Sequence, residues 1–216
     1  MRELSPSAGE LSGLVSVGLG EYLSVRELAG AISLFQDEYP KVRFALRSGS
    51  NADFLEGMTG GTIDVALLLE PFDDEALDRL PMGAVERWGA LVPMGMPMPS
   101  QDVIRPGDLA ARRVVTVQSD AAIQREFMEW SGEHTQQMDW YAHYNGIYNA
   151  AIFARERCSA VVCLEHDCSF EGMRFLPFDP PLEHGTALAW RSDRLQPEPV
   201  RTFIRFMRAH GASRQQ

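Results

Sequence analysis

The segment LVSVGLGEYLSVRELAGAISLFQDEYP at residues 14–40 decides the fold of this chain. Its first four residues include the apolar Leu14 and the β-branched Val15 and Val17 and predict a short strand, and Gly18 and Gly20 allow the chain to leave that strand sharply. A helix is predicted next, because apolar residues recur there at the spacing of one helix face. They are Val25, Leu28, Ala29, Ile32, Phe35 and Tyr39. Pro40 ends this helix, since proline cannot continue it.

A second strand follows the proline. Val42, Phe44 and Leu46 alternate with polar or small residues, which is the pattern of a strand with one buried face. The three elements form one β-α-β unit with parallel strands and a right-handed crossover. Residues 18–22 then lie where a strand end meets a helix N-terminus, which is where open α/β sheets bind ligands.

Composition limits the function of the chain. The 216 residues suffice for a large core, and 45% of them are apolar. The formal net charge of −10 makes these residues a poor binder of nucleic acid, because acidic surfaces repel phosphate. We find no apolar run of membrane-spanning length and no secretion signal. Three closely spaced cysteines, Cys158, Cys163 and Cys168, indicate the reduced cytoplasm and not a disulfide framework.

Strands and helices alternate twice along the chain, over residues 14–80 and again over 87–176. A strand at residues 186–190 and a helix at about 198–209 complete the predicted elements. This alternation predicts an α/β fold with two lobes and a central cleft.

Several segments, in order, resemble the effector-binding domain of LysR-type transcriptional regulators. They are GLVSVG at residues 13–18, LFQDEYPKV at 34–42, GTIDVALL at 61–68, LVP at 91–93, DL at 108–109, YNGIYNAA at 144–151 and the strand and helix at 188–207. Each segment is weak evidence alone, and together they are fairly specific. One departure is the triplet at residues 157–159, which replaces a glycine-rich turn of the family.

The resemblance implies two Rossmann-like lobes of the type 2 periplasmic-binding-protein kind. Lobe I is expected at residues 13–84 and 185–210 and lobe II at residues 85–184, with tails at residues 1–12 and 211–216. The winged helix-turn-helix and linker helix of the family do not occur in these residues, so DNA is a partner only through a missing N-terminal domain. The resemblance also implies a homodimer or tetramer, with the first helix at the interface.

The candidate effector-binding residues lie in loops at strand ends and helix N-termini, where free N–H groups favour an anion. The family binds effectors at the corresponding loops, so the resemblance supports the same positions. They are Leu19, Gly20, Glu21, Tyr22, Ser48, Ser50, Asn51, Leu69, Glu70, Gln118, Ser119, Asp120, Tyr144 and Asn145. The alternative is that Ser50, Asn51, Ser119, Asp120 and Asn145 merely cap helices.

Catalysis and metal binding have little support in the sequence. The five histidines show no recognised catalytic spacing, and cysteines five residues apart do not match a zinc site. We therefore expect no enzyme, no cofactor and no metal. Cys163 is expected in the core, and Asp64 is expected to stabilise a turn.

The charge of the candidate loops favours one class of effector. Glu21, Glu70 and Asp120 disfavour a simple dicarboxylate and leave room for an amine or an amino-acid-like molecule. The leading prediction is the sensory half of a LysR-type regulator, in which a small molecule binds between the lobes. The alternatives are a transport-type solute-binding protein, an enzyme on the same fold, and a free-standing effector-binding partner of a full-length regulator.

Overall fold

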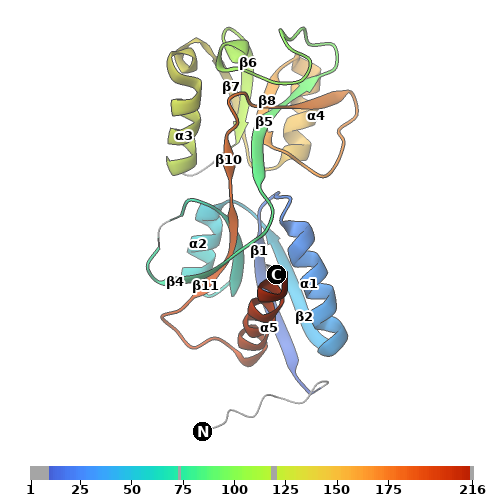
Figure 1. Cartoon of the computed structure of the whole chain (residues 1–216), viewed down its shortest axis with the longest axis vertical. Helices are drawn as coiled ribbons and strands as arrows, with labels where there is room; N and C mark the ends of the chain where they lie inside the picture. The colour runs from blue at the N-terminus through green and yellow to red at the C-terminus, as the bar shows by residue number, and fades with distance from the viewer. Residues whose placement is uncertain (1–9, 73, 118–120, 215–216) are drawn as a thin grey trace. The chain divides into compact units, whose positions relative to one another are not determined.

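The first β-α-β unit is present in the computed structural model, which describes residues 10–72, 74–117 and 121–214. Its elements are β1 (Ser12–Leu19), α1 (Val25–Glu38) and β2 (Lys41–Ser48) (Figure 1). β1 pairs with β2 in parallel over its whole length, which confirms the predicted strand direction. β1 also begins two residues earlier than predicted, at Ser12.

The chain divides into two units. The first holds the chain up to Gly20, Ser24–Ala84 and the chain from Thr186 onward, and the second holds Glu21–Leu23 and Val85–Gly185. The sequence prediction did not separate residues 21–23 from their neighbours. Thr186 donates a hydrogen bond from its hydroxyl to the Ser24 hydroxyl at 2.8 Å, so two points where the chain enters the first unit are joined.

The sheet of the first unit contains five strands in the order β2-β1-β3-β11-β4. The remaining three strands are β3 (Val65–Leu69), β4 (Leu77–Pro81) and β11 (Thr186–Arg191). β3 runs parallel to β1, and β11 lies antiparallel between β3 and β4. The three parallel strands therefore end at one edge of this sheet.

Two helices cover one face of this sheet through an aromatic cluster. Phe35 of α1 packs against Phe44 of β2 and against Phe203 and Phe206 of α5 (Glu198–Arg214). The predicted face of α1 was partly wrong, because Ala31 is buried and Ala29 is exposed. The predicted burial of Leu46 was also wrong, since that side chain is 62% exposed near the end of β2.

The other face of the first sheet is covered by α2 (Asn51–Thr59). Phe54 and Met58 of this helix pack against Ala66, Leu68 and other buried residues. Gly18 permits this packing, since a Cβ atom there would lie 2.7 Å from Cδ1 of Phe54. The sequence pattern assigned Gly18 to a sharp turn, whereas the structure places it inside β1.

The second unit contains a six-stranded sheet with the main order β10-β5-β8-β6-β7, and β9 pairs with β5. Its strands are β5 (Glu86–Pro93), β6 (Arg113–Val117), β7 (Asp139–Tyr144), β8 (Ala160–Leu164), β9 (Met173–Pro177) and β10 (Glu183–His184). Its helical segments are η1 (Pro106–Leu109), α3 (Ala121–Ser131), η2 (Gly132–Gln137) and α4 (Ile147–Arg157). The sequence pattern did not predict η2 and β4, because neither carries a clear apolar period.

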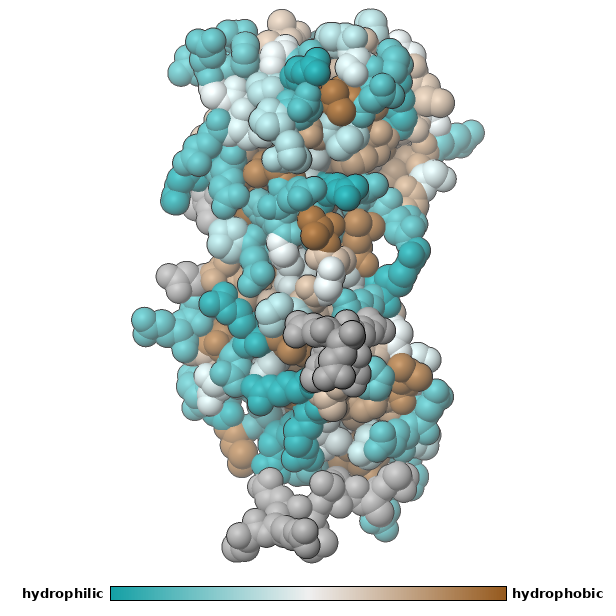
Figure 2. Space-filling model, viewed as in Figure 1, coloured by the Kyte–Doolittle hydropathy of each residue, from teal (hydrophilic) through white to brown (hydrophobic). Residues whose placement is uncertain are grey.

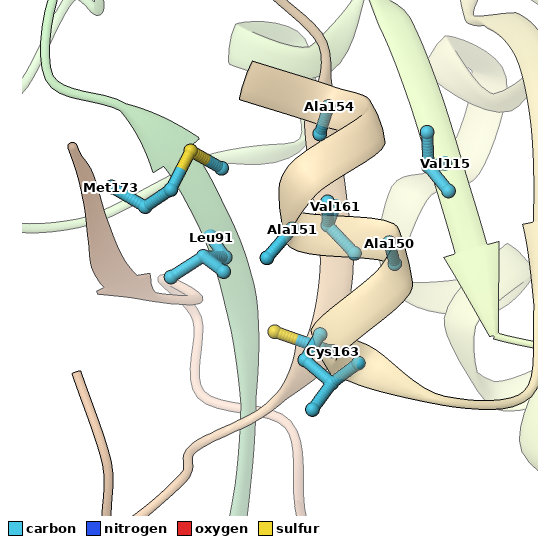
Figure 3. Close-up of a cluster of buried hydrophobic side chains, with 9 residues drawn as sticks. Leu91, Val115, Ala150, Ala151, Ala154, Val161, Cys163 and Met173 are labelled. Carbon is cyan, nitrogen blue, oxygen red and sulfur yellow. The ribbon is translucent and has the colours of Figure 1, made fainter. Parts of the chain in front are cut away.

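α4 packs on this sheet through small residues. Figure 3 shows Ala150, Ala151 and Ala154 on the face of α4 that meets Val161 and Cys163 of β8. Cys163 is only 2% exposed, which confirms its predicted place in the core. Small side chains let the helix backbone approach the sheet closely, so α4 is fixed tightly in the second unit.

Candidate functional site

The turn after β2 starts α2 and holds two of the candidate residues. Ser50 is the N-cap of α2, and its hydroxyl accepts a hydrogen bond from the Asp53 N–H at 3.3 Å. The Asp53 carboxylate in turn accepts the Ser50 N–H at 2.8 Å, which completes a capping box. The hydrogen bonds from Ser50 lower the pKa of the Asp53 carboxyl. The predicted capping role of Ser50 is therefore confirmed.

Asn51 ties this turn to the end of β3. Its side-chain amide donates to the Leu69 carbonyl at 2.8 Å, and its side-chain oxygen accepts the Leu69 N–H at 3.1 Å. Asn51 is 5% exposed and Leu69 is 3% exposed, so both bonds are buried. Asn51 thus supports the backbone at the edge where the parallel strands end.

Seven candidate residues of the first unit gather at this edge. In the β1–β2 register Leu19 lies opposite Ser48, and β1 is also paired with β3, which ends at Leu69. The seven are Leu19, Gly20, Ser48, Ser50, Asn51, Leu69 and Glu70. Glu70 is partly exposed, and its Oε1 lies 3.7 Å from Nη1 of Arg79. This edge combines the N-terminus of α2 with the carboxylate of Glu70, in addition to the Asp53 carboxylate of the capping box, so it offers both donors and acceptors.

The second unit gathers a different set of candidates around the start of α4. Glu21 accepts a hydrogen bond from the Ile147 N–H at 2.9 Å. Tyr144 ends β7, and its hydroxyl donates to the Val162 carbonyl at 3.0 Å. Burial raises the pKa of the Tyr144 hydroxyl well above its usual value, so this group stays protonated. Tyr22 is half-buried, and Asn145 is exposed.

The alternative role of Asn145, as a helix cap, does not hold. The N-cap of α4 is Gly146, one residue later, and glycine has no side chain that can cap. The carboxylate of Glu21, which lies 126 residues earlier in the sequence, satisfies the Ile147 N–H instead. The other predicted loop, with Gln118, Ser119 and Asp120, lies outside the described residues.

Burial keeps two side chains of the second unit, Cys163 and His166, in their neutral forms. Burial raises the pKa of the Cys163 thiol to about 12, so this thiol stays protonated and unreactive. Burial also lowers the pKa of His166, which favours the neutral imidazole. Within residues 10–72, 74–117 and 121–214, no three His, Cys, Asp or Glu residues are placed to hold a metal ion. Over the same ranges, no helix is long and apolar enough to cross a membrane.

Asp64 has the structural role that the sequence indicated. Its carboxylate accepts the Ser16 N–H at 2.8 Å, and its own N–H donates to the Ser16 carbonyl at 2.9 Å. These two bonds join the segment before β3 to β1. Asp64 therefore stabilises the connection into a buried strand, as predicted.

The model of the LysR substrate binding domain matches residues 8–212, which is nearly the whole chain. The chain belongs to this family. The fold and the order of the elements described above agree with the family resemblance that the sequence motifs indicated.

Three individual proteins are similar to this LysR substrate-binding domain in sequence or in structure. The transcriptional dual regulator GltC of Bacillus subtilis is 35% identical over 100 residues, which are 45% of this chain and 32% of that protein. The effector binding domain of QuiR in complex with shikimate superposes with a TM-score of 0.79 at 12% identity, covering 94% of this chain and 99% of that one. Full-length CbnR in complex with its target DNA gives a TM-score of 0.70 at 14% identity, covering 93% of this chain and 71% of that one.

Two facts follow from these figures. The LysR domain spans about a third of the length of the curated relatives that it matches, 32% of one and 38% of the other. The two solved structures have low sequence identity, so they establish the fold and not the ligand.

Sequence reasoning missed one buried charged residue of the LysR domain. Glu86, the first residue of β5, is 0% exposed and accepts the Leu23 N–H at 2.9 Å. A signal was available, because Glu86 stands two residues before Trp88 and four before Ala90, all on the buried face of one strand. Strand alternation thus predicts burial of Glu86, although its partner Leu23 is far away in the sequence.

Proposed function

We propose that this LysR substrate-binding domain senses a small-molecule effector and is the sensory part of a transcriptional regulator. The observation that carries the proposal is the family match over residues 8–212. The edge of the first sheet supports it, because α/β proteins bind ligands at the carboxyl ends of parallel strands. A transport-type solute-binding protein is not favoured, since the relatives found are regulators.

We propose that effector contacts come from the candidate loops of each unit. In the first unit the accessible groups are Ser48 and the carboxylate of Glu70. In the second unit they are Tyr22 and Asn145, beside the start of α4. Asn51 and Tyr144 contribute by holding backbone in place, because their polar atoms already bond Leu69 and Val162.

We propose an amine or amino-acid-like effector. Glu70 and Glu21 place negative charge in the candidate loops, and the whole chain carries a formal net charge of −10. A dicarboxylate would meet like charge on approach, whereas an ammonium group would be attracted. The shikimate bound to QuiR shows that a neighbour of the same fold takes a small carboxylate-bearing ligand, so shikimate is a suitable comparison probe.

We propose that the whole protein binds DNA through a winged helix-turn-helix domain and assembles as a homodimer or tetramer in the cytoplasm. Support comes from the solved complex of full-length CbnR with its target DNA and from the greater length of GltC. DNA binding by the whole protein is consistent with the acidity of these residues, since another domain would then carry the basic surface.

The proposal is tested by thermal unfolding of the 216-residue chain with shikimate, succinate, putrescine and L-arginine. We expect putrescine or L-arginine to raise Tm saturably, by about 5 °C or more at ~100 times Kd. Succinate should have the smallest effect. A larger shift with succinate than with either amine would contradict the proposed effector class.

Two matched pairs of variants test the location. Ser48→Arg should abolish the ligand-induced Tm shift, while Ser12→Arg should retain it, because Ser12 lies at the opposite end of the same strand pair. Asn145→Arg should abolish the shift and Asn149→Arg should retain it, since both side chains are exposed and Asn149 lies one turn into α4. Equal shifts in all four variants would show that the effector binds elsewhere.

A further inference from the structure

Residues 21–23 form a separate piece of chain in the connection between β1 and α1. Glu21–Leu23 belong to the second unit, although Gly20 before them and Ser24 after them belong to the first. We refer to Glu21–Leu23 as the strap. Two hydrogen bonds to carboxylates tie it to α4 and β5 of the second unit, one near each end.

The first bond joins the strap to α4. The Ile147 N–H donates to Oε2 of Glu21 at 2.9 Å. Gly146, the N-cap, has no side chain to serve this N–H, and the N-terminus of a helix favours a negative group. Glu21 thus completes the first turn of α4 from a distant part of the sequence.

The second bond joins the strap to β5. The Leu23 N–H donates to Oε2 of Glu86 at 2.9 Å, and Glu86 is fully buried. β5 is paired with both β8 and β10, and this pairing fixes the position of Glu86. In the register of β5 and β10, His184 lies opposite Glu86. A bond to a carboxylate held in this way is stronger than one between neutral groups.

The two bonds are close along the chain. Their strap residues are two positions apart, so even a fully extended backbone would separate the two Cα atoms by no more than ~7 Å. Ordering three residues costs conformational entropy of roughly the size that two charge-assisted bonds supply, so each bond carries a substantial share of what orders the strap. Loss of either bond should therefore loosen the whole strap.

We propose that the strap is a cooperative clasp in which the Glu21–Ile147 and Glu86–Leu23 bonds form and break together. Glu86 is a positioning residue in this device, because its hydrogen bond goes to Leu23 of the strap, whereas the Ile147 N–H is bonded to Glu21. Tyr22 lies at the centre of the strap, so an effector that contacts Tyr22 would change the first turn of α4. That last step rests on the proposed function, whereas the cooperativity of the two bonds does not.

Amide hydrogen exchange measured by NMR tests the clasp without any effector. In Glu86→Ala we expect exchange to accelerate about tenfold or more at Leu23 and also at Ile147, which Glu86 does not touch. Glu86→Gln retains an acceptor oxygen and should restore much of the protection at both amides. Glu156→Gln, on the exposed side of α4, is the control and should leave both rates unchanged. The Val161 amide in the core reports whether the second unit stays folded.

Unchanged exchange at Ile147 in Glu86→Ala, with acceleration at Leu23, would overturn the proposal, because the bonds would then be independent. If Glu86→Ala does not fold, the reciprocal variant Glu21→Ala decides, since Glu21 is exposed. Exchange at Leu23 should then accelerate as well, and an unchanged rate there would overturn the clasp. Neither result depends on whether the chain binds an effector.

Discussion

At the scale of single residues, two neighbouring polar side chains in one turn have different structural roles. Ser50 caps α2 at an accessible position, whereas Asn51 makes two buried bonds to the backbone of Leu69. The sequence predicted that both are either caps or ligands, because Ser and Asn favour helix N-termini equally. The buried hydrogen bonds between Asn51 and Leu69 could not be predicted, since Leu69 lies 18 residues away in the sequence.

Substitution of these two residues should separate the roles. Asn51→Ala should lower the free energy of unfolding by about 2–3 kcal/mol, because it leaves a buried N–H and a buried carbonyl unsatisfied. Ser50→Ala should lower it by about 1 kcal/mol, the usual cost of a lost cap. Urea denaturation of both variants measures the difference. A larger loss for Ser50→Ala would contradict the structural assignment of Asn51.

At the scale of elements, glycine inside a strand marks a place where another element approaches closely. Gly89 of β5 is the extreme case, because a Cβ atom there would lie 2.3 Å from the Leu176 carbonyl oxygen of β9. Gly95, just beyond β5, has no neighbouring atom within 4 Å of such a Cβ position. The residue type is the same at both positions, and only the surrounding atoms distinguish them.

Alanine at these two glycines tests the packing of β9 on β5. Gly89→Ala should destabilise the protein by about 2–3 kcal/mol, because the strand pair must shift to admit a methyl group. Gly95→Ala should change stability by less than about 0.5 kcal/mol, as is usual for surface positions. Thermal unfolding of both variants is sufficient. Similar Tm values for the two variants would show that β9 does not pack on β5 as described.

Elements with a strong apolar period were predictable, and those supported by their neighbours were not. The pattern of residues 14–48 predicted β1, α1 and β2 with parallel pairing, and the structure confirms it. β4, by contrast, has the sequence LDRLP with no buried residue, and its partner β11 lies more than 100 residues later. The face of α1 was partly wrong because α5, a remote segment, determines which residues are covered.

At the scale of the whole molecule, the visible face is largely hydrophilic (Figure 2). Teal side chains cover most of the visible face in Figure 2, and the brown ones form separate groups. The formal net charge of −10 makes this surface unfavourable for phosphate. The proposed binding of DNA through another domain is consistent with this charge.

Mobility-shift measurements test this directly. The 216-residue chain should not retard duplex DNA at low or at physiological salt, because its 30 acidic residues outnumber its 20 basic ones and repel the phosphates. A basic protein of similar mass is the positive control for the gel. Retardation that weakens as salt rises would reveal a basic patch and contradict the assignment of DNA binding to a separate domain.

The position of β11 has a consequence for synthesis on the ribosome. β11 lies between β3 and β4 in the first sheet, and β4 pairs with no other described strand. All of Val85–Gly185, the main part of the second unit, leaves the ribosome before β11 does. The edges of β3 and β4 that pair with β11 therefore stay without this partner while the second unit can already fold. Unpaired strand edges are sites where nascent chains can aggregate. The unit that begins the chain is thus the one that finishes folding last.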